Sequence, residues 1–154
     1  MLSDHDQVIE DFGLWYEGYG LPRTLGRMFA LLLLADEPRL SLDEIAARLN
    51  VSKASASTGA RQLVTFGFIE KTTVPGDRRD YYRMSQSGQE SQLRAGIKKL
   101  LSLTMLLGKA AAIPDLGPEA RERITGIHGM YASLEKHFES FFEQYSASRG
   151  AGKD

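Results

Sequence analysis

The sequence contains no cysteine, only three histidines and no long run of apolar residues. Without cysteine, the chain has no disulfide, no thiolate metal ligand and no thiol redox sensor. The histidines are scattered, and the spacing of His128 and His137 does not place two ligands on one helical face, so we expect no metal site and no cofactor. The longest apolar run, Met28 to Ala35, is far shorter than the about 20 residues of a membrane-spanning helix, so we expect no membrane partner.

Motifs of secretion and catalysis are also missing. The first residues are polar and acidic, unlike a signal peptide, so we expect a cytoplasmic protein. The sequence has no Gly-rich phosphate loop and no plausible arrangement of Ser, His and Asp, so we do not expect an enzyme. The share of hydrophobic residues, 42%, and of charged residues, 25%, is ordinary for a folded globular domain.

An overall excess of positive charge is absent as well, since the formal net charge is -1. This balance at first argues against nucleic acid as a partner, because phosphate neutralisation by Lys and Arg supplies most of the affinity. The charge is unevenly distributed, however. Residues 48–83 contain seven basic and three acidic side chains, a local balance of +4. This asymmetry favours a DNA-facing segment on an acidic body.

Apolar residues at helical spacing predict a helix from Asp4 to Tyr19 and a second, largely buried helix from Leu25 to Ala35. The first helix has an unusually aromatic face with Trp15, Tyr16 and Tyr19. These rings are a candidate pocket for a small effector with a quaternary ammonium group, which cation–π attraction would hold. The alternative, which we favour, is that the rings pack against the long helices at a dimer interface.

Two helices joined by a tight turn are predicted next. Ser41 and Glu44 form the pattern of a capping box, and Asn50 suits the left-handed conformation that closes a helix. Ser52 is a good N-cap for a second helix that we expect to end at Thr65. Small or apolar residues occupy the positions where the two helices should cross: Ile45, Ala46, Leu49, Val51, Ala56, Gly59, Ala60 and Leu63. The pattern is that of a helix-turn-helix.

A β-hairpin should follow the helix-turn-helix. Residues 68–74 are rich in β-branched and apolar side chains, residues 75–77 form a turn, and residues 80–84 contain two tyrosines that suit cross-strand packing. Arg78 and Arg79 lie at the tip of this hairpin. Arginine at such a tip is favoured in a minor groove, where the negative potential is concentrated.

Two long helices are predicted after the hairpin, over residues 86–112 and 118–145. Apolar residues of the last helix follow a regular 3-4 spacing, the pattern of helices that pack lengthwise on one another. The residues of this dimerisation seam are Ile124, Ile127, Tyr131, Leu134, Phe138, Phe141 and Tyr145. The seam can pack either within its own subunit or across a dimer, and the spacing fits both.

The fold class is therefore mainly α with a small β-hairpin: a winged helix-turn-helix flanked by N- and C-terminal dimerisation helices. We expect N-terminal helices over residues 1–37, which join the dimer body and support the winged helix. The winged helix-turn-helix should occupy residues 38–86 and the dimerisation helices residues 87–145, with a disordered polar tail over residues 146–154.

The candidate DNA-binding residues lie on the side of the fourth helix that faces away from its partner, and on the hairpin tip. A recognition helix enters the major groove, where short side chains permit close approach and Arg61 can bond a guanine edge or a phosphate. The candidates are Ser52, Lys53, Ala54, Ser55, Ser57, Thr58, Arg61, Arg78 and Arg79.

Residues 42–88 resemble the winged-helix core of MarR-type regulators, most specifically at Asp77-Arg78-Arg79 and the strand that follows. Residues 12–14 and 20–27 further resemble the GbsR-type branch of that family, which is associated with betaine and choline metabolism or osmotic response. The resemblance implies an obligate dimer with interlocking first and last helices and one recognition helix in each half-site of a palindrome. It also implies that Arg78 or Arg79 contacts DNA while Asp77 braces the wing. One departure is Gly59, where a larger apolar residue is usual.

The predicted function is that of a homodimeric transcriptional repressor that binds double-stranded DNA at a palindromic operator and responds to a small effector. The alternative is a winged-helix module that docks a protein partner and does not bind DNA. The cationic balance of residues 48–83 favours DNA.

Overall fold

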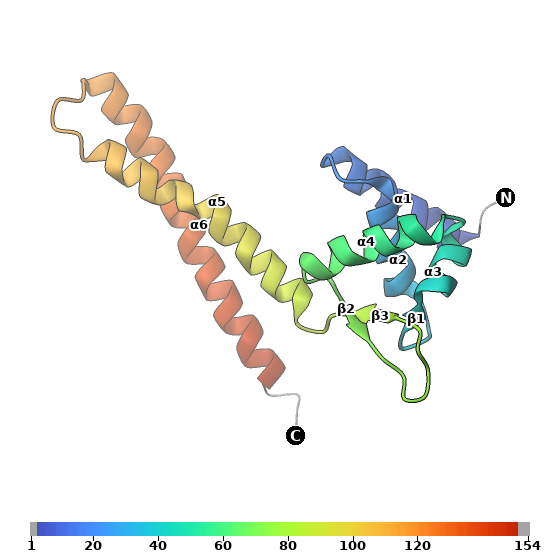
Figure 1. Cartoon of the computed structure of the whole chain (residues 1–154). Coiled ribbons are helices and arrows are strands. Elements are labelled where there is room, and N and C mark those ends of the chain that lie inside the picture. Colours follow the sequence, from blue (N-terminus) through green and yellow to red (C-terminus); the bar gives the residue numbers. More distant parts are fainter. Residues whose placement is uncertain (1–2, 151–154) are drawn as a thin grey trace. The chain divides into compact units, whose positions relative to one another are not determined.

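The structure is a computed structural model that describes residues 3–150 (Figure 1). It has a mainly α fold with one small antiparallel sheet, as predicted. The elements are α1 (Asp4–Gly18), α2 (Arg23–Leu34), β1 (Leu40–Ser41), α3 (Leu42–Leu49), α4 (Lys53–Thr65), β2 (Ile69–Thr72), β3 (Tyr81–Met84), α5 (Gly88–Ala111) and α6 (Pro118–Gly150). They form two compact units, residues 3–92 and residues 93–150. Within residues 3–150, no helix is both long and apolar enough to cross a membrane.

The helix-turn-helix has the caps that the sequence predicts. The hydroxyl of Ser41 accepts a hydrogen bond from the backbone N–H of Glu44 at 3.3 Å, and the Glu44 carboxylate accepts one from the Ser41 N–H at 2.7 Å. Asn50 closes α3 with a φ of 52°. The hydroxyl of Ser52 caps α4 by accepting from the backbone N–H of Ser55 at 3.1 Å. These bonds satisfy backbone groups that a helix end leaves free, so they fix both helix boundaries.

The core of the first unit lies between α2 and the helix-turn-helix. All the predicted crossing residues are buried except Val51, which is half-buried. Gly59 contacts Met28 of α2, because a Cβ added to this glycine would lie 3.1 Å from the terminal methyl of Met28. Met28 is fully buried and takes the volume that a larger side chain on α4 would need. The glycine at this position is therefore matched to the long side chain opposite it.

The helices α1 and α2 cross at close range and support the helix-turn-helix. A Cβ on Gly26 would lie 2.2 Å from the carbonyl oxygen of Phe12, so the two backbones touch at this glycine. Glu10 forms ion pairs of 2.8 Å with both Arg23 and Arg27. Arg27 also donates to the carbonyl of Leu49 at 3.0 Å, which ties α2 to the end of α3. The N-terminal helices thus belong to the same compact unit as the winged helix.

The sheet has the strand order β1-β3-β2, with all pairs antiparallel. β2 and β3 form the predicted hairpin, and Ile69 pairs with Met84 at its base. The sequence did not predict β1, because a strand of two residues has no periodicity of its own. Leu40 pairs with Tyr82, and both side chains are buried. The sheet therefore joins the wing to the residues that immediately precede α3.

The second unit consists of α6 and of α5 from residue 93. Of the seven seam residues, three are half-buried in the single chain: Ile124, Tyr131 and Phe138. The other four are exposed, namely Ile127, Leu134, Phe141 and Tyr145. The most buried aromatic residue of this unit is Phe142, which the seam pattern did not include. Packing within the single chain thus buries only part of the seam.

The prediction of a disordered tail from residue 146 is wrong for residues 146–150, because α6 continues to Gly150. These residues contain no proline, and alanine and arginine favour the helix, so nothing stops its propagation at Tyr145. The remaining residues of the predicted tail, 151–154, lie outside the described residues.

Candidate nucleic-acid interface

The exposed face of α4 is a stripe of short side chains with one long cation. Ala54, Thr58 and Arg61 follow one another at intervals of four and three residues, and all three are exposed. The opposite face of α4 is buried, so the helix can present only this side to a partner. Ser52 and Lys53 are exposed as well, whereas Ser55 and Ser57 are half-buried at the flanks. Short side chains let the helix backbone approach the floor of a major groove.

The wing tip is held by a cluster around Asp77. The Asp77 carboxylate accepts hydrogen bonds from the backbone N–H of Arg79 at 2.9 Å and from the Arg79 guanidinium at 2.6 to 3.1 Å. It also accepts one from the Tyr81 hydroxyl at 2.8 Å. The Arg79 guanidinium lies over the Tyr81 ring, 5.3 Å from its centroid. Asp77 and Tyr81 therefore fold Arg79 back onto the wing and fix the shape of the loop.

The hydrogen-bonded Arg79 guanidinium holds the pKa of the Asp77 carboxyl far below its usual value, and the Arg79 N–H and the Tyr81 hydroxyl lower it further. The same bonds hold the pKa of Arg79 above its usual value. The bond to Asp77 likewise raises the pKa of the Tyr81 hydroxyl, because the phenolate would face a carboxylate.

We predict that the wing cluster is intact from neutral pH down to about pH 4, since the usual pKa of Asp is about 3.9. A depressed pKa in the folded state means that the stabilisation is fully present above the unfolded value and is lost as the pH falls through the folded one. An NMR titration of the Asp77 carboxyl carbon should therefore have its midpoint well below the usual value for Asp, about 3.9. A midpoint at the usual value for Asp would contradict the cluster.

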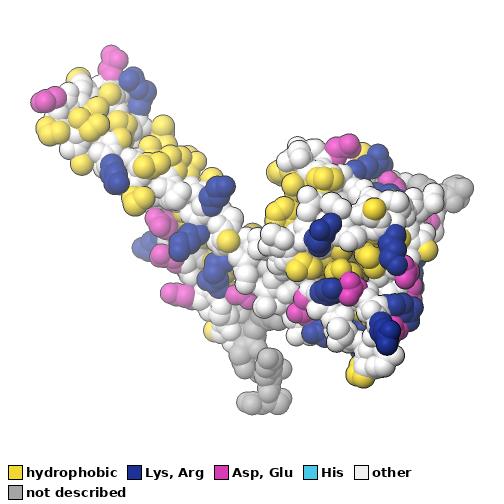
Figure 2. Space-filling model, viewed as in Figure 1, with side chains coloured by type: hydrophobic (Ala, Val, Ile, Leu, Met, Phe, Trp, Pro, Cys, Tyr) yellow, Lys and Arg dark blue, Asp and Glu magenta, His cyan; other side chains and the backbone are white. Residues whose placement is uncertain are grey.

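The N-terminus of α4 and the wing share one hollow, of about 230 Å³. Lys53 of α4 lines it together with Arg78 and Arg79 of the wing. Two acidic side chains, Asp43 and Asp80, also line it, with Leu42. The recognition helix and the wing thus meet in a single charged surface on the first unit. Figure 2 shows basic side chains interspersed with acidic ones on this unit.

Most cations of residues 48–83 are paired with an acidic side chain. The pairs are Arg48–Glu37, Lys53–Asp43 at 2.7 Å, Lys71–Asp80 at 2.9 Å, Arg79–Asp77 at 2.6 Å and Arg83–Glu70 at 2.7 Å. Arg61 and Arg78 form no ion pair within residues 3–150. The sequence count of +4 does not reveal this division. Among the cations of residues 48–83, Arg61 and Arg78 are the two that can take a phosphate without first giving up an acidic partner.

Sequence reasoning missed two polar side chains beside the recognition helix. Thr24 of α2 and Gln62 of α4 line a hollow of about 380 Å³ together with Ser55 and Thr58. Gln62 follows Arg61 directly, so helical periodicity could have predicted its position at the edge of the exposed face. Thr24 had no local signal, because it comes to this surface only through the packing of α2 on α4.

The three aromatic residues proposed as an effector pocket differ in their exposure to solvent. Tyr16 is only 4% exposed and packs in the core near Phe29, with ring centroids 6.1 Å apart. Trp15 and Tyr19 are 59% and 70% exposed, and their ring centroids are 4.7 Å apart. The Tyr16 ring also lies 5.5 Å from the Trp15 ring, so the three rings are neighbours, but only Trp15 and Tyr19 present much of their surface to solvent.

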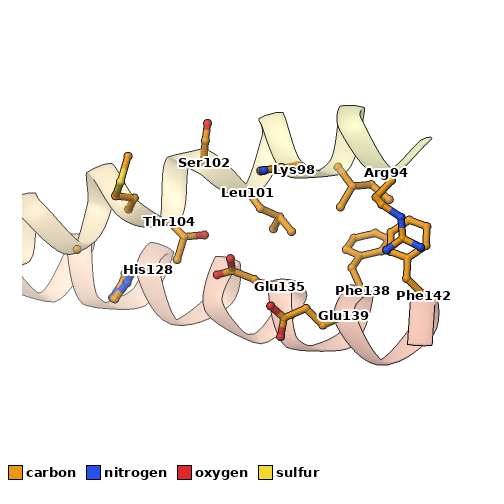
Figure 3. Close-up of a pocket in the computed structure, with 13 residues that line it drawn as sticks. Arg94, Lys98, Leu101, Ser102, Thr104, His128, Glu135, Phe138, Glu139 and Phe142 are labelled. Carbon is orange, nitrogen blue, oxygen red and sulfur yellow. The ribbon is translucent and has the colours of Figure 1, made fainter. Parts of the chain in front are cut away.

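The second unit has an open groove of about 660 Å³ between α5 and α6 (Figure 3). Its floor is largely apolar, with Leu101 and Phe138, and Arg94 lies over the ring of Phe142 at 4.0 Å from the centroid. Lys98 of α5 and Glu135 of α6 also line the groove. No group of three or more His, Asp or Glu side chains in the described part of the chain is arranged to hold a metal ion.

Comparisons with known proteins agree with this geometry. The sequence model described as MarR family matches residues 19–80. The HTH-type transcriptional regulator MmpR5 of Mycobacterium tuberculosis (strain ATCC 25618 / H37Rv) is 32% identical over 145 residues, which cover 94% of this chain and 88% of that protein. The HTH-type transcriptional repressor GbsR of Bacillus subtilis (strain 168) is 32% identical over 74 residues, which cover 48% of this chain and 40% of that protein.

A solved crystal structure described as a transcriptional regulator shares the fold with a TM-score of 0.68 and 30% sequence identity, and the match covers 94% of this chain and 99% of that one. The match to MmpR5 and the match to this structure both extend over nearly the whole chain, beyond the winged helix itself. The chain therefore belongs to the MarR family and is a winged-helix transcriptional regulator.

Proposed function

We propose that the chain binds double-stranded DNA through α4 and the wing and thereby regulates transcription. The observation that carries this proposal is the shared hollow of Lys53, Arg78 and Arg79, which makes the recognition helix and the wing one surface. Arg61 and Arg78 supply cations without acidic partners among the described residues. In this proposal α4 lies in a major groove and the wing lies over an adjacent minor groove. Asp77 braces the wing by holding Arg79.

We also propose that the regulator acts as a homodimer. The second unit exposes many large apolar side chains in the single chain, and Figure 2 shows them along its length. Apolar surface of this extent marks an interface. The exposed seam residues Ile127, Leu134, Phe141 and Tyr145 of α6 are the proposed contacts, with the N-terminal helices and their exposed Trp15 and Tyr19 as a second contribution. A twofold axis would present two copies of α4 to the two half-sites of a palindromic operator.

We further propose that the chain is a repressor of the GbsR-type branch and that a small effector modulates its binding to DNA. Its support is the partial match to the repressor GbsR, which covers less than half of this chain. In this proposal the effector changes the separation of the two recognition helices away from the roughly 34 Å of one DNA turn. Of the three rings proposed for the effector pocket, Trp15 and Tyr19 are exposed and Tyr16 is buried.

The proposal is tested by fluorescence anisotropy of the protein with duplex DNA from upstream of its own coding sequence. We expect binding that weakens steeply as salt is raised from about 50 to 200 mM, because phosphate contacts release counterions. Affinity that does not change with salt would count against DNA as the partner. The rival is a protein-docking module, and it predicts that Arg61→Ala and Arg78→Ala weaken capture of a protein while leaving DNA retention unchanged.

A further inference from the structure

The hollow between α4 and the wing contains an acidic side chain placed against a DNA-facing cation. The Asp43 carboxylate accepts from the Lys53 ammonium group at 2.7 Å, and both side chains are more than half exposed. Asp43 and Lys53 line the same hollow as Arg78 and Arg79. A phosphate that enters this hollow to bind Lys53 therefore meets the Asp43 carboxylate, which is already bound to the Lys53 ammonium group.

Local structure keeps Asp43 in this position. Asp43 lies in the first turn of α3, where the positive end of the helix dipole favours a carboxylate. The neighbouring Glu44 is committed to the capping box with Ser41, so it does not compete for Lys53. Asp43 is therefore stable in the hollow whether or not Lys53 remains paired with it.

Lys53 has no such support from its own helix. It is the first residue of α4, and the first turn of α4 contains no acidic side chain. The positive end of the α4 dipole disfavours a cation at this point. The carboxylate of Asp43, which comes from the other helix of the helix-turn-helix, compensates for both effects in the free protein.

We propose that Asp43 limits the affinity of the regulator for DNA by competing with phosphate for Lys53. This inference rests on the proposed function, because it assumes that the hollow faces DNA. The competition acts on the phosphate contact and therefore applies to duplexes of any sequence, whereas Ala54, Thr58 and Arg61 of the exposed stripe do not line this hollow. Exposed ion pairs are weak, so phosphate can displace Asp43 and binding is reduced rather than prevented.

The test is the affinity of Asp43→Asn for a duplex of random sequence, with Asp115→Asn as the matched control. Asp115 is exposed in the loop between α5 and α6, and its replacement makes the same change in net charge. We expect Asp43→Asn to bind the duplex about two- to fivefold more tightly per subunit, because the free energy of an exposed ion pair corresponds to a change in affinity of this size. The slope of log affinity against log salt should become steeper by about 0.9 per lysine released. Asp115→Asn should match the wild type in both measurements.

A second pair of variants shows whether the effect passes through Lys53. In a Lys53→Met background, the gain from Asp43→Asn should shrink to less than half of its value in the wild type. An undiminished gain would overturn the proposal, as would an Asp43→Asn protein that equals the wild type in affinity and slope. Weaker binding together with a lower melting temperature would make Asp43 a structural residue and would overturn it too. If the wild type binds no duplex, the proposed function fails and this inference fails with it.

Discussion

Replacing Arg61 by alanine should weaken binding to the operator by about tenfold to hundredfold, the usual cost of losing a specific arginine contact. Arg61 is the only long cation in the exposed stripe of α4, and it has no acidic partner within the described residues. Its Nε lies 3.5 Å from the Ser57 carbonyl, so its guanidinium is held only by a long bond to its own helix. The measurement is fluorescence anisotropy at several salt concentrations with operator and random duplexes.

The salt dependence of Arg61→Ala identifies the group that Arg61 contacts. A phosphate contact predicts equal losses for both duplexes and a slope reduced by about 0.9 per subunit. A base contact predicts a loss confined to the operator with the slope unchanged. Arg123→Ala is the matched control, since Arg123 is an exposed arginine of α6 in the second unit. Equal affinities of Arg61→Ala and Arg123→Ala for DNA would show that α4 is not part of the DNA interface.

Replacing Gly88 by alanine should destabilise the first unit by about 2 to 3 kcal/mol or more, the cost of strong overpacking. A Cβ at this position would lie 1.8 Å from the carbonyl oxygen of Gly67 and 2.8 Å from the Ser85 side chain. Gly67 has a φ of 78° and forms the turn that ends α4, so its backbone cannot move aside without disturbing the recognition helix. Thermal unfolding should show a melting temperature lower by about 10 °C or more.

The matched control is Gly129→Ala in α6. A Cβ at Gly129 would meet no atom within 4 Å, and alanine favours a helix interior by about 1 kcal/mol over glycine. Gly129→Ala should therefore melt at or above the temperature of the wild type. A Gly88→Ala protein that melts with the wild type would show that the junction between the wing and α5 is looser than the structure indicates.

The parts of the fold that the sequence predicted correctly depend on local interactions. Ser41 with Glu44, Asn50 and Ser52 act on neighbouring residues, so the boundaries of α3 and α4 followed from the sequence. The hairpin followed from a turn between two β-prone segments in the same way. Such signals require no knowledge of the tertiary structure.

The parts that sequence reasoning missed depend on contacts between distant segments. β1 exists because Leu40 pairs with Tyr82, and the burial of Phe142 depends on its packing between two helices. The candidate site shows the same division. Periodicity selected the exposed face of α4, but the pairing of Lys53 with Asp43 required the structure. Charge counting overestimated the free cations for this reason.

The central claim is that one surface, formed by α4 and the wing and repeated by a twofold axis, binds DNA. Hydroxyl-radical footprinting on the upstream duplex tests it most directly, because it reports each backbone position that the protein covers. We predict two protected segments about one helical turn apart, roughly 10 base pairs between their centres, and their loss in an Arg61→Ala and Arg78→Ala double variant. A single protected segment, or protection that persists in the double variant, would contradict the claim.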